Sequence, residues 1–218
     1  MKATFSRILR GLKHPRSGIL YLLLGKDGFS RLATVETCSN ATVVYSPIGN
    51  HLRATTDIHE HLTTLYMLAC EFKCKTILEL GTRSGESTLA LTLAAKKTHG
   101  KVYSIDIEEC RQAEKLIIDR SLSDFWEFIR CDDLEIKWER KIDFLFIDTS
   151  HTYEQTFCEL SKFEPMVEVG GIIVLHDSVS CSGVIQAIVD YIQGKPDLSV
   201  YEYLNNNGLC VVFKENPQ

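Results

Sequence analysis

The sequence of 218 residues has no excess of basic residues, no long apolar run and no paired cysteine motif. Its 24 lysines and arginines are outnumbered by 29 acids, and the net charge of −5 gives the chain no general attraction for nucleic acid. No apolar run approaches the ~20 residues that span a bilayer, so we expect no transmembrane segment. The apolar run at 18–25 is short and no small-residue cleavage site follows it, which argues against a signal peptide.

The eight cysteines are scattered along the chain rather than grouped. Only Cys70 and Cys74 are close, and a C-x3-C spacing without a second pair is poor for zinc. We interpret the cysteines as buried, reduced thiols, which indicates a cytoplasmic protein.

The first 31 residues carry seven basic side chains and one acid, Asp27. Ile8, Leu9 and Leu12 between them make a basic amphipathic segment. Such a segment either contacts an anionic membrane or a polyanion, or packs as a helical arm on the main domain with its charges in water. We assign residues 1–56 to an N-terminal basic arm and lid-like extension, and residues 57–218 to the main domain.

From residue 57 onward, helical periodicity alternates with short β-rich runs, and we find no internal repeat. Five β-α alternations predict a doubly wound parallel sheet of the Rossmann-like α/β class with helices on both faces. The NNNG run at 205–208 predicts a C-terminal hairpin, so one of the last two strands must be antiparallel. The predicted strands are 76–80, 101–106, 126–131, 143–148, 172–176, 199–204 and 209–214, and the predicted helices are 57–73, 84–97, 109–120, 152–167 and 182–193.

The first strand ends in the stretch ILELGTRSGES (77–87), with an acid, Glu79, and two glycines, Gly81 and Gly85. The turn lacks both the lysine of a phosphate-binding P-loop and the G-x-G-x-x-G spacing of a nicotinamide site. A carboxylate at the strand tip suits a cationic ligand. The next strand ends in Asp106, where an acid typically bonds the two hydroxyls of a ribose. These residues predict a pocket for a nucleoside that carries a positive charge.

The motifs LELGTRSGES and VYSIDIEE, with the closing hairpin, resemble class I S-adenosylmethionine-dependent methyltransferases over residues 57–214. The resemblance implies that Gly81 and Gly85 let backbone approach the cofactor and that Asp106 holds its ribose. It also implies that Glu79 faces the methionine end, with Ser87 nearby. Asp132 matches the position that contacts the adenine amine, and Asp133 fits almost as well.

Two further strands end in groups that could hold a metal ion. Asp148 ends the fourth predicted strand, and His176 and Asp177 end the fifth. Neighbouring strands lie ~4.8 Å apart, so these groups can converge on one ion. Oxygen ligands favour Mg²⁺, Mn²⁺ or Ca²⁺ over zinc.

FLFIDTSHTY (144–153) and IIVLHDS (172–178) resemble metal-dependent small-molecule O-methyltransferases of the catechol and macrolide-sugar types. The resemblance implies Asp148 and Asp177 as metal ligands, and His151 as the general base beside Asp148. His176 departs from the acid that the sugar enzymes carry there, and Ser178 departs from the asparagine of the catechol enzymes. A histidine ligand would favour Mn²⁺ or Fe²⁺ over Mg²⁺. Alternatively, the two acids cap helices, the histidines are structural, and no metal binds.

The leading hypothesis is an O-methyltransferase with S-adenosyl-L-methionine and a divalent metal, Mg²⁺ or Mn²⁺, as cofactors. Its partner would be a small-molecule acceptor, such as a sugar or secondary metabolite, and no nucleic acid; a homo-oligomer stays open. The alternatives are a metal-dependent hydroxylase on the same fold and a non-catalytic S-adenosylmethionine-binding module.

Overall fold

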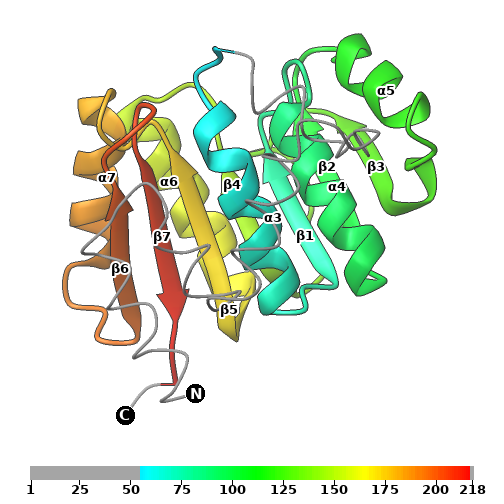
Figure 1. Ribbon diagram of the computed structural model, residues 1–218. Helices are drawn as coiled ribbons and strands as arrows, with labels where there is room; N and C mark the ends of the chain where they lie inside the picture. The colour runs from blue at the N-terminus through cyan, green and yellow to red at the C-terminus, as the bar shows by residue number, and fades with distance from the viewer. Residues whose placement is uncertain (1–54, 217–218) are drawn as a thin grey trace, which may run out of the picture.

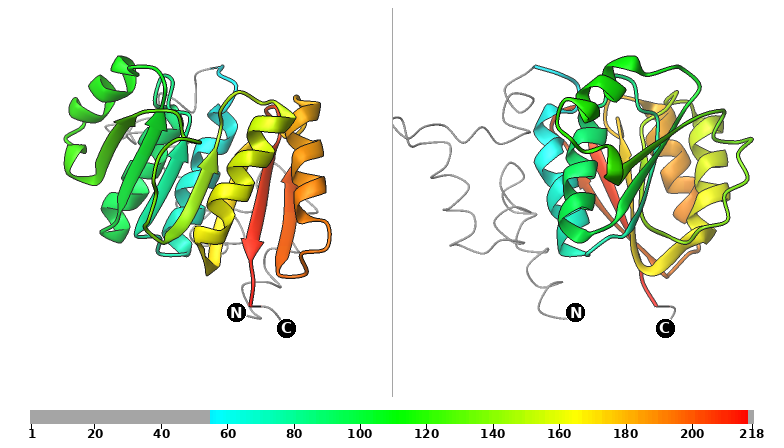
Figure 2. Two further views of the ribbon diagram at one scale, coloured as in Figure 1. Left: turned by 180° about the vertical axis from the view of Figure 1, so that it is seen from behind. Right: turned by 90° about the vertical axis from the view of Figure 1, so that its right-hand side faces the viewer.

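The computed structural model describes residues 55–216, so the basic segment and nearly all of the predicted N-terminal arm lie outside the described residues. A single sheet runs through the middle of the described part, and helices cover both of its faces (Figures 1 and 2). None of the helices within these residues is long and apolar enough to cross a membrane.

The sheet has seven strands in the order β3-β2-β1-β4-β5-β7-β6. The first five strands run parallel, and β7 is antiparallel to both β5 and β6. This confirms the predicted α/β class, the strand number and the antiparallel C-terminal hairpin. The strands are β1 (Thr76–Leu80), β2 (Lys101–Asp106), β3 (Trp126–Arg130), β4 (Ile142–Ile147), β5 (Val167–His176), β6 (Leu198–Tyr203) and β7 (Leu209–Lys214).

The helices form two layers, as the edge-on view in Figure 2 shows. Helices α3 (Leu62–Glu71) and α4 (Glu86–Thr98) pack on one face, with α5 (Arg111–Ile118) beside α4. Helices α6 (Tyr153–Phe163) and α7 (Ser182–Ile192) pack on the other face. Short 3-10 turns precede α3 (η2, His59–His61) and β3 (η3, Ser123–Phe125) and follow α6 (η4, Glu164–Met166).

The central strands are apolar on both sides because both faces are covered. Side chains alternate between faces along a strand. In β4, Phe144 and Phe146 join the core under α3 and α4, whereas Leu145 and Ile147 join the core under α6 and α7. This two-sided burial is typical of parallel sheets and explains why the strand runs lack an alternating polar pattern.

The strand β5 differs most from its predicted bounds. The predicted strand covered 172–176, but β5 begins at Val167 and includes both Gly170 and Gly171. Gly170 has φ +87°, and the pairing of β4 with β5 shifts register between Ile142 and Phe144. The glycines therefore lie at an irregularity inside the strand.

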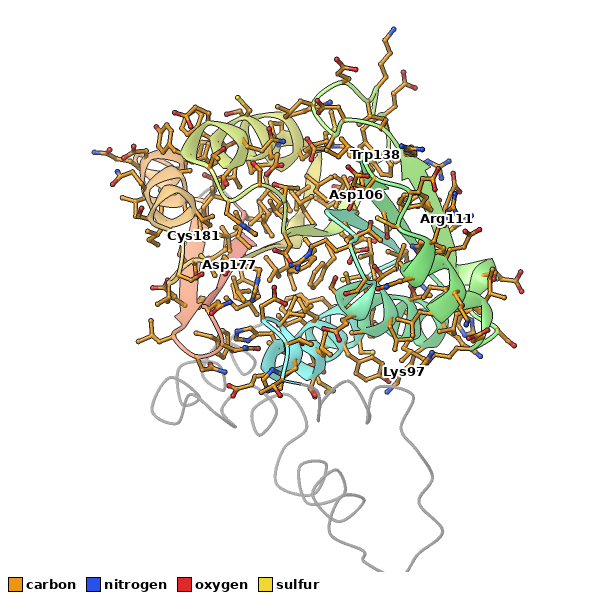
Figure 3. The ribbon with its side chains drawn as sticks, turned by 90° about the horizontal axis from the view of Figure 1, so that it is seen from above. Lys97, Asp106, Arg111, Trp138, Asp177 and Cys181 are labelled. Carbon is orange, nitrogen blue, oxygen red and sulfur yellow. The ribbon has the colours of Figure 1, made fainter. Side chains whose placement is uncertain are left out.

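The parallel strands all end at one edge of the sheet, which is where open α/β sheets bind ligands. Figure 3 looks down on this edge and shows Asp106 at the end of β2, with Asp177 and Cys181 together on the far side. Two of the predicted site residues, Asp106 and Asp177, therefore lie at one rim of the sheet.

Candidate active site

A cavity of about 350 Å³ opens at the carboxyl ends of β1, β2 and β4. We call it the main cavity. Five of its lining residues are acids, and within the part of the chain that the structure describes no basic side chain lines it. A pocket of this charge favours a cationic ligand over an anionic one. Its lining consists of Gly81, Ile105, Asp106, Ile107, Glu108, Cys131, Asp132, Asp133, Asp148, Thr149, Ser150 and Gln155.

The structure requires glycine at Gly81 and at Gly85 for two different reasons. Gly81 has φ +85°, and a Cβ there would lie 2.0 Å from the carbonyl oxygen of Asp148. Only glycine lets the turn after β1 pass so close to the end of β4 and line the main cavity. Gly85, at φ +87°, would instead place a Cβ 2.6 Å from Cβ of Ala113, so it is required by the packing of α5. Any role of Gly85 toward the cofactor remains a prediction.

Asp106 lies at the rim of the main cavity and holds the glycine turn in place. Its carboxylate accepts backbone N–H bonds from Thr82 at 2.8 Å, Arg83 at 3.2 Å and Glu108 at 2.9 Å. Burial alone would raise its pKa, but these hydrogen bonds outweigh burial and lower the pKa. Asp106 is therefore ionised at neutral pH. The thiol of Cys110 also hydrogen-bonds this carboxylate, so a ligand hydroxyl at Asp106 would share or replace one of these four partners.

Glu79 is fully buried and faces neither cavity directly. Its carboxylate accepts hydroxyl bonds from Ser87 at 2.7 Å, Thr88 at 2.7 Å and Ser104 at 2.5 Å. Burial raises its pKa to about 7, against the three hydroxyl bonds that lower it. These three hydrogen bonds join β1, β2 and the start of α4. The carboxylate of Glu79 is thus occupied by protein hydroxyls, and its contact with a ligand stays a prediction. Ser87 also lines a small second cavity beside Gly81.

Asp132 and Asp133 lie together at the far wall of the main cavity. Asp132 accepts the backbone N–H of Leu134, whereas Asp133 accepts the side-chain amide of Gln155 at 3.0 Å. The same amide donates to Glu159 at 2.8 Å. Burial and the charge of Asp133 raise the pKa of Glu159 to about 8, so this buried acid is mainly protonated at neutral pH.

The predicted metal and base residues meet at the tips of β4 and β5. We call Asp148, His151, His176 and Asp177 the charged cluster. Nε2 of His151 lies 3.0 Å from Oδ1 of Asp148 and 3.1 Å from Oδ2 of Asp177. Nδ1 of His176 lies 3.1 Å from Oδ2 of Asp177 and 3.5 Å from Oδ1 of Asp148. Asp148 also lines the main cavity, so the cluster and the cavity share one wall.

Opposite charges set the protonation of the charged cluster. Burial lowers the pKa of His176, but the two neighbouring carboxylates reverse this and raise it to about 10. Burial raises the pKa of Asp177, but His176, Ser180 and His151 lower it to about 2. The pKa of His151 is raised, chiefly by its hydrogen bond to Asp148. His176 therefore carries a positive charge at neutral pH that offsets part of the charge of the two acids.

Backbone strain also marks the charged cluster. His151 and Asp177 both have φ +59°, in the left-handed region that non-glycine residues rarely adopt. Strained residues of this kind gather at functional sites because the surrounding structure must hold them.

His176 is enclosed on its other side by His61 and the 205–208 loop. Its Nε2 lies 3.3 Å from the carbonyl oxygen of Asn206, and the rings of His61 and His176 are 5.7 Å apart. Nε2 of His61 contacts the carbonyl oxygens of Asn205 and Asn206. Burial and the charge of His176 lower the pKa of His61 to about 4, so His61 is neutral.

The donor set fits a divalent metal ion. Ligand atoms of Asp148, His176 and Asp177 all lie within 4.8 Å of one another. Nδ1 of His176 is buried and lies within ion-pair distance of both acids. A divalent ion between the two carboxylates would replace the proton on this nitrogen, and an imidazole nitrogen together with two carboxylates is a donor set that suits such an ion.

Several lining residues were not predicted from the sequence. Asp57 and Ile58 line the second cavity, where Asp57 pairs with Arg83 at 2.9 Å. Gln155 and Cys181 reach the site from the first turn of α6 and the start of α7. None of these four residues belongs to a sequence motif. Tertiary packing brings each of them to the site.

Comparisons with known proteins bear on the fold that carries this site. Residues 78–178 match a family model described as a methyltransferase domain. The fold is similar to the SAH-bound methyltransferase PaMTH1 of Podospora anserina, with 14% identity over 88% of this chain and 97% of that one and a TM-score of 0.66. It is also similar to a methyltransferase from Geobacter sulfurreducens, with 17% identity over 86% and 96% and a TM-score of 0.62. The O-methyltransferase TomG from Streptomyces achromogenes, in complex with SAM, matches with 16% identity over 78% and 88% and a TM-score of 0.59.

Proposed function

We propose that this chain, whose residues 78–178 match a family model described as a methyltransferase domain, transfers a methyl group from S-adenosylmethionine to a hydroxyl of a small molecule. One observation carries the proposal. Asp148 belongs both to the acid-lined main cavity and to the charged cluster, so a cofactor and a proton-accepting group would meet there.

The main cavity suits the charge and the polar groups of this cofactor. S-adenosylmethionine carries a sulfonium and an ammonium, and the five acids of the cavity favour both. Asp106 would accept from the ribose hydroxyls, and Asp132 would accept from the adenine amine. Gly81 would bring backbone against the cofactor, while Glu79 and Ser87 would hold the turn and α4 in position. The O-methyltransferase TomG, one of the similar folds, was solved with SAM.

His151 would act as the general base. Its Nε2 faces Asp148 and Asp177, so the hydrogen bond to Asp148 assigns the proton to Nε2 and leaves the lone pair on Nδ1 when the ring is neutral. In the transfer, the acceptor oxygen forms a bond to the methyl carbon as the carbon–sulfur bond breaks. The proton of the acceptor hydroxyl passes to His151, and the products are the methyl ether and S-adenosylhomocysteine. Asp148 orients the ring and stabilises the imidazolium that results.

A divalent ion would be held by Asp148, His176 and Asp177. When bound, such an ion supplies a Lewis acid that makes the acceptor hydroxyl easier to deprotonate. The single histidine in this set favours Mn²⁺ or Fe²⁺ relative to an all-oxygen site.

A second candidate is a metal-dependent hydroxylase on the same fold. The observation that favours it is the pairing of two histidines with two carboxylates in the charged cluster, a donor set that also suits Fe²⁺. Oxygen consumption without release of S-adenosylhomocysteine would identify this activity.

The test is methyl transfer by the purified full chain to a panel of phenols, catechols and sugars, with Mg²⁺ or Mn²⁺ supplied. Release of S-adenosylhomocysteine and the mass of the methylated product are measured. We compare His151→Asn with His99→Asn, because His99 is an exposed histidine with nearly the same φ, +57° against +59°, and asparagine tolerates that conformation. Loss of rate in His151→Asn alone supports the assignment. Equal rates in both variants would overturn it.

A further inference from the structure

A second group of potential ligands lies beside the predicted metal site. Ligand atoms of His151, Asp177 and Cys181 all lie within 4.8 Å of one another. Asp177 belongs to both groups, whereas Cys181 has no part in the proposed methyl transfer. Figure 3 shows Cys181 next to Asp177 at the rim.

The chain brings this thiol to the site through the turn between β5 and α7. The backbone N–H of Cys181 donates to the carbonyl of Asp177 at 3.0 Å, which closes the DSVSC turn. Cys181 is the N-cap residue of α7, and its side chain is partly exposed. The hydroxyl of Ser180 also donates to Asp177, which fixes the carboxylate beside the turn.

Close packing of α7 against the loop before α6 keeps Cys181 near His151. A Cβ on Gly183 would lie 2.8 Å from the backbone nitrogen of Tyr153 and 3.0 Å from the carbonyl oxygen of His151. Glycine at 183 therefore permits an approach that any larger residue would prevent.

The three donors are one nitrogen, one oxygen and one sulfur. A thiolate with an imidazole selects zinc and similar borderline-soft ions, whereas Mg²⁺ and Ca²⁺ prefer oxygen alone. Zinc accepts three protein ligands with a fourth position open. His176 lies beside the same carboxylate, with its buried Nδ1 3.1 Å from Oδ2 of Asp177. It is a further donor beside the shared carboxylate.

We propose that His151, Asp177 and Cys181 form an inhibitory site for Zn²⁺ or a chemically similar cation. A neutral imidazole has one lone pair, so zinc bound to His151 removes the proton acceptor of the proposed reaction, on which this inhibition rests. Zinc would also take up a carboxylate oxygen of Asp177 and compete with the ion that assists methyl transfer. Zinc at this site therefore slows transfer even when the cofactor is bound.

The test measures cation binding separately from activity, with the full chain kept reduced. Co²⁺ is used as a coloured substitute for zinc, because a cysteine ligand gives a thiolate-to-cobalt charge-transfer absorption. Cys181→Ser is compared with Cys158→Ser, since Cys158 is exposed on α6 and outside the group. Circular dichroism and thermal unfolding check that both variants fold.

We expect the charge-transfer absorption in the wild type and in Cys158→Ser, and its displacement by Zn²⁺. Cys181→Ser should lose the absorption and bind Zn²⁺ at least about 10- to 100-fold more weakly, since loss of even an outer partner of a ligand costs that much. Zinc should inhibit methyl transfer in the wild type and act at correspondingly higher concentration in Cys181→Ser.

Unchanged cobalt absorption in a folded Cys181→Ser variant would overturn the site. Stimulation of methyl transfer by zinc would overturn the inhibitory role. Zinc binding that depends on Cys181 in a protein with no methyl transfer would support the cation site and contradict the proposed function.

Discussion

Replacement of Asp106 tests the cofactor assignment, because this carboxylate accepts hydrogen bonds from the glycine turn and is also the residue that we propose to hold the ribose. In Asp106→Ala, the backbone N–H groups of Thr82, Arg83 and Glu108 lose their acceptor. A hydrogen bond contributes about 0.5–1.5 kcal/mol net, and water can replace the acceptor for the two exposed groups. We therefore expect a loss of about 1–3 kcal/mol in the free energy of unfolding, measured by urea denaturation without cofactor.

The loss in cofactor affinity should be separate from this destabilisation. Hydrogen bonds to a charged group contribute about 1.5–3 kcal/mol, which corresponds to about a 10- to 150-fold rise in Kd. Asp106→Asn should fall between wild type and Asp106→Ala, because its amide keeps one acceptor oxygen. Isothermal titration calorimetry with S-adenosylhomocysteine measures all three proteins under conditions where each is folded.

Asp119→Ala is the matched control, because Asp119 is an exposed acid at the end of α5 and lines neither cavity. Its replacement removes the same charge as Asp106→Ala. Its affinity should equal that of the wild type. Wild-type affinity in a folded Asp106→Ala protein would refute the ribose assignment. A loss of equal size in Asp119→Ala would show that net charge, rather than a contact, sets the affinity.

Three other predictions concern the glycine turn, a buried acid and the base. Gly81→Ala should lower the free energy of unfolding more than Gly170→Ala in chemical denaturation. The two glycines have φ +85° and +87°, but a Cβ at Gly81 would lie 2.0 Å from the carbonyl oxygen of Asp148, whereas nothing lies within 4 Å of a Cβ at Gly170. Gly170→Ala should cost only the left-handed backbone strain of about 1–2 kcal/mol, and equal losses in the two variants would contradict the close approach at Gly81. Glu159 has a pKa of about 8 in the folded protein, against ~4.3 for an unperturbed glutamate in the unfolded chain, so its contribution to the free energy of unfolding should fall as pH rises between these values. The fall should be at most about 1.4 kcal/mol per pH unit, and Glu159→Gln should flatten it. Parallel pH profiles of stability for the two proteins would show that Glu159 is not protonated in the folded state. His151→Asn should lower the rate of methyl transfer by about 10²–10⁴-fold. The wild-type rate should rise with pH through a pKa above ~6.5, because the hydrogen bond to Asp148 raises the pKa of His151. A wild-type rate that does not change with pH would contradict the assignment of His151 as the base.

Much of the fold could be predicted because the parallel strands are buried on both faces. Their short apolar runs, separated by helical periodicity, leave few arrangements other than a doubly wound sheet. The boundary of β5 could not be predicted, because Gly170-Gly171 is usual in a turn and only the pairing with β4 keeps it within a strand. Helix ends were likewise set by packing, as in α6, which ends at Phe163 where η4 begins.

The site was predictable where it depends on strand ends. Asp106, Asp148, His176 and Asp177 follow directly from the rule that parallel strands present their last residues at one edge. Cys181 could not be found in this way, because its place depends on the approach of α7 to the loop at His151.

The buried environment of Glu79 also could not be predicted from the sequence. Its three hydroxyl donors come from β2 and α4, at separations of 8, 9 and 25 residues along the chain. A carboxylate at a strand tip can face a ligand or the protein interior, and only the packing of α4 on the sheet decides which.

The central claim is that a nucleoside cofactor and a divalent ion meet at Asp148, and anomalous X-ray diffraction tests it most directly. Crystals of the full chain are grown with S-adenosylhomocysteine and Mn²⁺, and data are collected at a wavelength where manganese scatters anomalously. We predict the ribose at Asp106 and a manganese peak among Asp148, His176 and Asp177, whose ligand atoms already lie within 4.8 Å of one another. Cofactor density in the main cavity with no manganese peak, and with His151 still between the two carboxylates, would contradict the metal-assisted site.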